Sequence, residues 1–122
     1  MGTTDILILT RRIDPEELRR LIREGFRDMV KYVADIERGV IAIGGNLHTD
    51  AEELLLQGGS RQADLWGANY YPGRGREACV EFSSLINIRP AQGNPGMEVE
   101  DVSVRERIRA LTFALVGDGG EL

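Results

Sequence analysis

The chain contains a single histidine, and acidic residues follow it closely. His48 comes soon after the glycine pair Gly44–Gly45, and Asp50 follows two positions later. An imidazole titrates near neutral pH, so it can act as a general base or bind a metal ion. One histidine near a few carboxylates is nevertheless a weak metal pattern, because zinc motifs combine several Cys or His ligands at fixed spacing. We therefore predict His48 as the candidate catalytic residue and predict no metal site.

The same segment also has a simple structural interpretation. Asp50 or Thr49 is well placed to cap the start of a helix, and Glu53 follows Asp50 at the spacing of a capping box. Acidic groups in a first helical turn also interact favourably with the helix dipole. The sequence thus predicts Asp50 as a helix cap before any chemical role, and the role of His48 stays open.

A second group of polar residues lies further along the chain. In a strand over residues 85–89, Asn87 and Arg89 point to one face, and the two isoleucines of the segment point to the core. Neighbouring strands over 65–71 and 78–84 add polar side chains to the same face, and a glycine-containing loop follows. The predicted ligand-binding residues are Asn69, Glu81, Ser83, Asn87, Arg89, Gln92 and Asn94.

Arg89 is the central residue of this hypothesis. A guanidinium group can hold a carboxylate or a phosphate with two parallel hydrogen bonds, which a lysine cannot copy. The predicted partner is therefore a small anionic ligand. The alternative is an ordinary solvent-facing side of an antiparallel sheet, in which Arg89 pairs with Glu81.

Several familiar functions are not indicated. The sequence contains no GxxxxGK[ST] phosphate loop, no GxGxxG motif and no GxSxG motif. A net charge of −5 argues against binding to nucleic acid. The chain has one cysteine, Cys79, no secretory signal, and no apolar stretch near the ~20 residues of a membrane span. We expect a cytoplasmic protein without a membrane partner, and the sequence identifies no cofactor.

The elements that position these residues follow from periodicity and turn signals. Asp14 and Pro15 start a helix whose apolar residues recur at helical spacing. Segments 29–37 and 40–45 alternate as strands, with a turn at residues 38–39, and one helix over 14–37 is the alternative. The other expected strands lie over 5–9, 65–71, 78–84 and 85–89, and the last two are either separate strands or one bent strand. A short helix runs from about Asp50 to the Gly58–Gly59 pair, and a last helix runs from about Ser103 to Val116, with Ser103 in a capping box. An irregular loop over 90–100 and a frayed tail over 117–122 are also expected.

These elements predict one α+β domain over residues 1–122. It has two longer helices, one short helix and a mostly antiparallel sheet of five or six strands, whose order the sequence does not reveal. A short domain with many strands must protect the edges of its sheet, and pairing two copies is one way to do so. We therefore expect a homo-oligomer, most simply a homodimer.

Four segments together resemble a small, uncharacterised prokaryotic family, a domain of unknown function. They read DMVK at 28–31, IAIGGNLHTD at 41–50, LWGANYYP at 65–72 and INIRPAQGN at 86–94. The likeness spans about residues 27–109. It implies no activity, so no catalytic role is carried over. The segments coincide with the two regions selected above on chemical grounds.

Two functional hypotheses follow from the residues. The first is a domain that binds a small polar or anionic ligand, with His48 supplying a proton if a reaction takes place. The second is a non-enzymatic protein-interaction or regulatory module that acts as a homo-oligomer. A cleft with an apolar rim would favour the first, and a flat face covered by a second subunit would favour the second.

Overall fold

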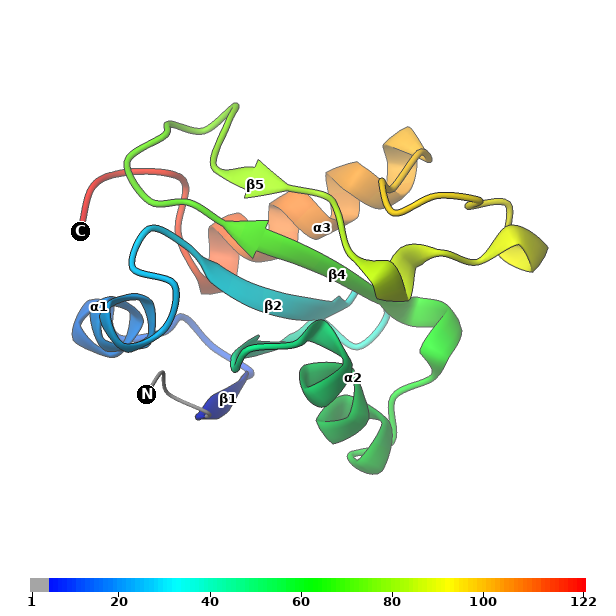
Figure 1. Ribbon diagram of the computed structural model, residues 1–122, viewed down its shortest axis with the longest axis horizontal. Coiled ribbons are helices and arrows are strands. Elements are labelled where there is room, and N and C mark those ends of the chain that lie inside the picture. Colours follow the sequence, from blue (N-terminus) through cyan, green and yellow to red (C-terminus); the bar gives the residue numbers. More distant parts are fainter. Residues whose placement is uncertain (1–4) are drawn as a thin grey trace.

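The chain forms one antiparallel sheet with helices on both faces (Figure 1). A computed structural model of the protein describes residues 5–122. In these residues the sheet has five strands in the order β1-β3-β2-β4-β5, and every neighbouring pair is antiparallel. The predicted α+β class is confirmed. The strands are β1 (Ile6–Leu9), β2 (Val30–Asp35), β3 (Val40–Gly44), β4 (Leu65–Tyr70) and β5 (Val80–Glu81); the α-helices are α1 (Pro15–Glu24), α2 (His48–Gln57) and α3 (Val102–Leu115); the short 3₁₀ helices are η1 (Gln62–Asp64), η2 (Leu85–Asn87) and η3 (Pro90–Gln92).

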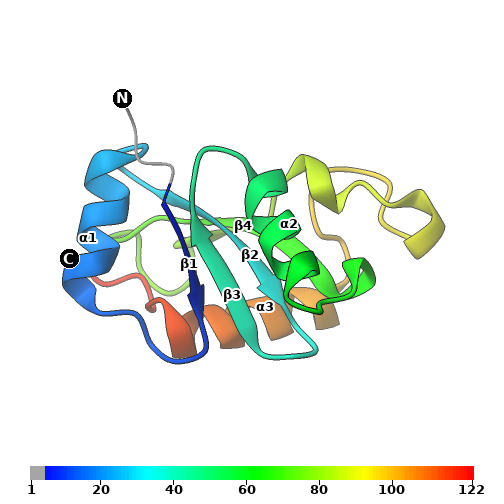
Figure 2. The same cartoon turned by 90° about the horizontal axis from the view of Figure 1, so that it is seen from below.

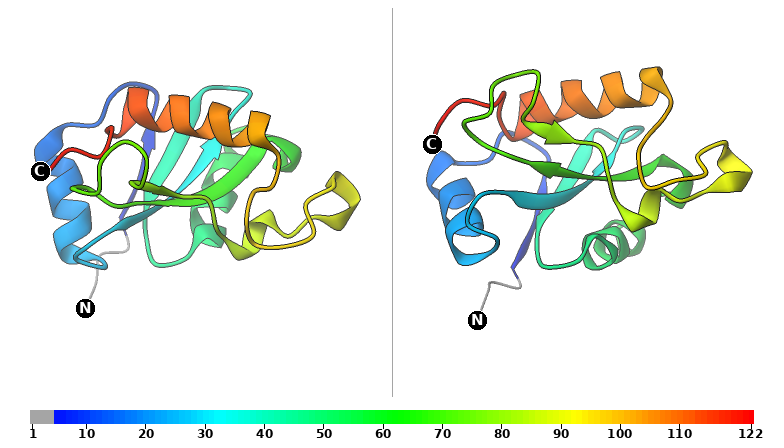
Figure 3. Two further views of the ribbon diagram at one scale, coloured as in Figure 1. Left: turned by 90° about the horizontal axis from the view of Figure 1, so that it is seen from above. Right: turned by 45° about the horizontal axis from the view of Figure 1, so that its top comes forward.

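Different helices cover the two faces of the sheet. α1 and α3 pack on one face, where Leu18 and Ile108 join strand residues such as Tyr32 and Ile43 in the main core. α2 packs on the opposite face, where a smaller core includes Leu55. Figure 2 shows α2 in front of the sheet, and the left view of Figure 3 shows α3 in front of it from the other side. The segments that carry the polar candidates lie on the α2 side or at its rim.

The first half of the chain follows the sequence pattern. Asp14 caps α1, because its carboxylate accepts a hydrogen bond from the Glu16 N–H at 2.8 Å, and Pro15 is the first helical residue. α1 ends at Glu24 and β2 begins at Val30. The two predicted strands are therefore present, and the alternative of one long helix is wrong.

α2 begins earlier than predicted. Its first residue is His48, its N-cap is Leu47, and Asp50 is only the third helical residue. The reason is the turn before it, where Gly44 and Gly45 have φ angles of 112° and 79° and redirect the chain sharply after β3. The prediction of Asp50 as the cap is wrong, and α2, with ten residues, equals α1 in length.

α3 also begins at a different residue. Asp101 is its N-cap, and the carboxylate accepts hydrogen bonds from the N–H groups of Ser103 and Val104 at 2.8 and 3.2 Å. The predicted cap at Ser103 is therefore wrong. An aspartate two residues earlier offers a stronger, charged acceptor to the helix start.

The segment after β5 does not continue as a strand. β5 contains only Val80–Glu81, and residues 85–87 form η2 instead. The close approach of η2 to β4 depends on Gly67, because a Cβ atom at this position would lie 2.6 Å from the Ser84 side chain. Without that Cβ, η2 can pack on β4, so the alternation of apolar and polar residues in 85–89 does not reflect a strand.

The C-terminal tail is held against the loop that follows β4. The Gly73 N–H donates to the carbonyl oxygens of Gly119 and Gly120, each at 3.0 Å. The Gly119 N–H in turn donates to the Tyr70 hydroxyl at 2.9 Å. Gly119 and Gly120, in the segment predicted to fray, are thus hydrogen-bonded to the rest of the domain.

Candidate functional site

Three polar side chains form a row across β2, β4 and β5 on the α2 side of the sheet. Lys31 pairs with Asn69 in the strand register, and Asn69 pairs with Glu81. Directly opposite residues of antiparallel strands share a face, so the three side chains are neighbours. The Asn69 amide donates to a Glu81 carboxylate oxygen at 2.7 Å, and the Tyr71 hydroxyl donates to the same oxygen at 3.2 Å. Two of the predicted ligand-binding residues are thus brought together.

His48 lies beside this row. It is the first residue of α2, only 9% of it is exposed, and its Nε2 atom lies 2.8 Å from the backbone oxygen of Ala68 in β4. A carbonyl oxygen can only accept, so Nε2 must carry the hydrogen. In the neutral ring Nδ1 is then a bare acceptor. His48 therefore has one nitrogen fixed by the sheet, and the side chain of Asn69 is a further polar neighbour of the ring.

Burial lowers the pKa of His48 to about 4, because the charged imidazolium loses its hydration there. The hydrogen bond to Ala68 acts in the opposite direction, as do the side chains of Asn69 and Glu81, whereas the positive charge of Lys31 lowers the pKa of His48 further. The desolvation dominates. His48 is therefore neutral throughout the physiological pH range.

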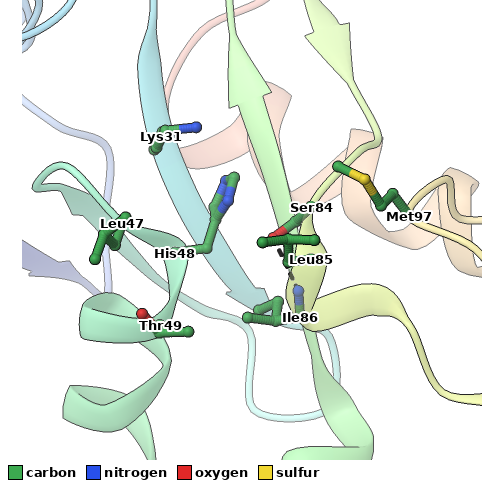
Figure 4. Close-up of a pocket in the computed structure, with 8 residues that line it drawn as sticks. All are labelled: Lys31, Leu47, His48, Thr49, Ser84, Leu85, Ile86 and Met97. Atoms are coloured by element: carbon green, nitrogen blue, oxygen red, sulfur yellow. Dashed lines mark hydrogen bonds between the residues drawn. The ribbon is translucent and has the colours of Figure 1, made fainter.

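A pocket of about 430 Å³ opens between the start of α2 and η2. Figure 4 shows His48 projecting from α2 toward the strands, between Lys31 and the segment of Ser84 and Leu85. The rim is apolar and open to solvent, since Leu85 is 71% exposed and Leu47 is 57% exposed. The full lining is Lys31, Leu47, His48, Thr49, Ser84, Leu85, Ile86 and Met97. The arrangement combines an apolar rim with a cation and a histidine.

One polar atom beside the pocket is left without a well-formed hydrogen bond. The Asn69 Oδ1 atom is buried and makes no well-formed hydrogen bond among residues 5–122, although the Asn69 side chain lies close enough to His48 to raise the pKa of its imidazole. Buried side-chain oxygens are nearly always paired, so an unpaired one calls for an explanation. We call Lys31, His48, Asn69 and Glu81 the pocket cluster. It has hydrogen-bonding capacity that the fold itself does not use.

The predicted loop residues have a different environment, which begins with Asn87. This side chain is fully buried. Its oxygen accepts from the Gly67 N–H at 2.9 Å, and its amide nitrogen donates to the Gly67 carbonyl oxygen at 2.9 Å and to the Met97 carbonyl oxygen at 3.2 Å. The side chain thus takes the place that a neighbouring strand would occupy beside β4.

Arg89 contacts the same edge of β4. Its guanidinium group donates to three backbone oxygens, those of Ile86, Gln62 and Leu65. It also lies 4.6 Å from the centre of the Trp66 ring. Glu81 bonds to Asn69 and Tyr71 instead, so the alternative in which Arg89 pairs with Glu81 is wrong.

The electrostatic environment of Arg89 is dominated by burial. The side chain is 9% exposed, and its nearest carboxylate oxygen belongs to Glu52 of α2, at 4.0 Å. Desolvation lowers the pKa of Arg89, and the charge of Glu52 partly offsets this. The cation is held by carbonyl dipoles, with most of its donors already engaged.

The remaining predicted residues hold the loop together. The Asn94 amide donates to the carbonyl oxygens of Asn87, Gly96 and Glu98 at 2.8 to 3.0 Å, and its oxygen accepts from the Glu100 N–H at 3.0 Å. We call Asn87, Arg89 and Asn94 the loop cluster. Outside it, Gln92 donates to the carbonyl oxygen of Ala63 at 2.9 Å, and Ser83 forms an isolated bridge with Glu98.

The profile of a family described as a protein of unknown function (DUF5674) matches residues 7–115. The chain belongs to the DUF5674 family. The resemblance seen in the sequence is thereby confirmed at the level of a domain of unknown function. Comparisons with curated proteins and with solved structures gave no significant match.

Two further properties of the DUF5674 domain concern metals and membranes. Within residues 5–122, no three side chains of the types His, Cys, Asp or Glu are grouped so that they could hold a metal ion. The same residues include no helix that is both long and apolar enough to span a membrane.

Cys79 is buried in the main core, and burial raises the pKa of its thiol.

Of the residues that line the pocket in this DUF5674 domain, sequence reasoning selected His48 but missed the charged one, Lys31. Lys31 is the only lysine of the chain and was not among the predicted site residues. Its alternation with Tyr32 in β2 already puts it on the face away from the main core. Only the register, which aligns Lys31 with Asn69, reveals that it faces the other polar candidates.

Proposed function

We propose that the pocket between α2 and η2 binds a small organic anion that also carries an apolar part. One observation carries this proposal: Lys31 lines the pocket beside His48 and has no carboxylate within 4 Å among residues 5–122. A partly buried ammonium group without a counter-ion favours an incoming anion. Lys31 thus takes the role that the sequence suggested for Arg89, whose donors hold backbone oxygens.

The shape of the pocket indicates the rest of the ligand. Its volume of about 430 Å³ falls in the range of roughly 300–1,000 Å³ that is usual for small-molecule sites. Leu47, Leu85 and Met97 form an exposed apolar rim around it. An acid with an aliphatic or aromatic portion would place its charged group on Lys31 and its apolar part against the rim.

His48 supports binding better than turnover. Its Nδ1 lone pair can accept a hydrogen bond from a hydroxyl or amide group of the ligand. A base whose pKa is about 4 takes up protons poorly at neutral pH, and general-base catalysis works best when the pKa lies near the working pH. We therefore propose His48 as a ligand-orienting residue, with binding as the primary activity.

Ligand-dependent stabilisation tests this proposal. Thermal melts would be recorded with a panel of aliphatic and aromatic carboxylates and phosphate monoesters, followed by calorimetric titration of the best compound. Lys31→Met should abolish binding, and Lys31→Arg should retain part of it because the charge remains. Arg61→Met is the matched control, since Arg61 is an exposed cation outside the pocket. The proposal fails if no compound stabilises the protein, or if Lys31→Met binds as well as Arg61→Met.

The apolar rim supports a second candidate function, the docking of a partner protein. The large apolar side chains of Leu85 and Leu47, at 71% and 57% exposure, both lie on the rim, and exposed apolar patches rimmed by polar residues mark protein-interaction sites. Leu85→Ser separates the two functions. It should weaken a protein complex strongly, whereas a small acid held by Lys31 should lose only part of its affinity.

A further inference from the structure

The two outer edges of the sheet differ in how their backbone groups are hydrogen-bonded. Along β4, β5 covers only two positions, and the side chains of Asn87 and Arg89 bond to the backbone of Gly67 and Leu65 beyond it. This edge is therefore closed by side chains. β1, at the other end of the sheet, pairs only with β3, and no other backbone partner is found among residues 5–122.

β1 is short, with four residues, but it lacks the other features that normally protect an edge strand. Its sequence, ILIL, contains no charge and no proline, and the ladder with β3 runs without a bulge. Ile8 is 49% exposed on the α2 side of the sheet, where α2 packs mainly on β2, β3 and β4. A groove of about 540 Å³ runs beside residues 7–9, between β1 and the chain leading into α1. Figure 2 shows β1 at the end of the sheet.

We propose that β1 pairs with β1 of a second copy of this chain, so that two five-stranded sheets join into one continuous antiparallel sheet. Two-fold symmetry restricts the register, because a residue whose amide points outward must face a residue of the same kind. The two-fold axis must therefore lie where two copies of the same residue face each other, and not between two neighbouring residues of the strand. The two central choices are Leu7 and Ile8.

Charge selects the register centred on Ile8. In that register the acidic start of β1, preceded by Asp5, faces the end of β1 in the other copy, where Arg11 follows the strand in a bend, so Asp5 and Arg11 approach each other at both ends of the pairing. Arg11 is exposed and has no carboxylate within 4 Å in its own chain, among residues 5–122, while Asp5 also bonds to Arg20 at 3.0 Å. The register centred on Leu7 would instead set Asp5 against Leu9, an apolar residue. A second copy is therefore electrostatically complementary to this edge.

Molar mass in solution tests the pairing directly. Light scattering and sedimentation at tens of micromolar should show twice the 13.5 kDa of one chain. Ile8→Lys places two ammonium groups at the centre of the interface and should give the 13.5 kDa species with an unchanged circular dichroism spectrum. Val102→Lys is the control, because Val102 is 70% exposed at the start of α3 on the other face. A monomeric wild type, or a dimer that Ile8→Lys leaves intact, overturns the proposal.

A charge exchange tests the register even if Ile8→Lys fails to fold. Arg11→Asp alone sets two aspartates against each other at each end of the pairing, and Asp5→Arg alone sets two arginines against each other, so each variant should be monomeric. A mixture of the two should form a heterodimer with both ends complementary. No other occupant of the edge predicts this result, and two variants that stay dimeric alone, or monomeric when mixed, would refute the Ile8-centred register. The test does not depend on the pocket.

Discussion

The loop cluster and the pocket cluster contain similar chemistry, since each combines asparagine with a basic side chain. They differ in what those groups contact. Asn87, Arg89 and Asn94 bond to backbone atoms that would otherwise be unpaired at the edge of β4 and in the following loop. In the pocket cluster, Lys31 has no ion-pair partner in residues 5–122, and the Asn69 Oδ1 atom makes no well-formed hydrogen bond there. A polar side chain thus indicates a binding site only when it is not already used to satisfy backbone hydrogen bonds.

The strongest test of this contrast removes the central side chain of the loop cluster. Asn87→Ala should lower the free energy of unfolding by about 4 kcal/mol, because it leaves the Gly67 N–H and two carbonyl oxygens buried without partners. Urea denaturation measures the change. Gln92→Ala removes one bond at an exposed position and should cost well under ~1 kcal/mol. Equal losses in the two variants would contradict the structural role of Asn87.

A pH series tests whether His48 of the pocket cluster is held neutral by burial. The folded-state pKa of His48, about 4, lies below the ordinary value of 6.5, so the unfolded chain binds a proton in this interval before the folded one does. Stability should therefore fall as the pH drops from 6.5 to about 4, by about 3 kcal/mol in total, and His48 should add no dependence above that range.

His48→Gln is the control for the pH series. Glutamine can still donate to Ala68 but does not titrate, and the chain has no other histidine. Denaturation at several pH values should show that the difference between wild type and His48→Gln changes across this window. A constant difference would mean that His48 is not held neutral by burial.

Arg89→Lys gives the next largest effect. A lysine can reach only some of the three carbonyl oxygens that the guanidinium group binds, so stability should drop by about 2 kcal/mol. The affinity for any anion bound at Lys31 should stay the same, and Glu81→Ala should not reproduce the loss. An unchanged melting temperature together with weaker anion binding would show that Arg89 contributes to the ligand site and not to stability.

The smallest expected effect belongs to Lys31. Because it forms no ion pair among residues 5–122, Lys31→Met should change the stability of the unliganded protein by less than ~0.5 kcal/mol. Parallel melts of this variant and Arg89→Lys compare the two clusters directly. A large loss in Lys31→Met would show that its contact with the Phe26 ring, at 5.3 Å, is structural.

Local signals in the sequence predict the parts of the fold that depend on neighbouring residues. Asp14 with Pro15 fixes the start of α1, and alternation identifies β2, β3 and β4. Alternation also brings Asn69 and Glu81 together correctly, because both lie in real strands. These features need no knowledge of distant contacts.

The errors arise where a distant contact overrides the local pattern. Residues 85–89 alternate as a strand would, yet Gly67, about twenty positions earlier, lets this segment fold over β4 as η2. Arg89 looks like a ligand residue because its carbonyl partners, on η1 and β4, cannot be seen in the sequence. The role of Lys31 depends on strand register, which alternation does not fix.

The bond between Gly67 and Asn87 also provides a built-in spectroscopic reporter. The Gly67 N–H lies in the middle of β4 but donates to a side chain of η2, the segment that forms one wall of the pocket. Its chemical shift and its hydrogen-exchange rate therefore respond when this wall moves away from the sheet. A single backbone amide can thus monitor the opening of the pocket by nuclear magnetic resonance, without any attached label.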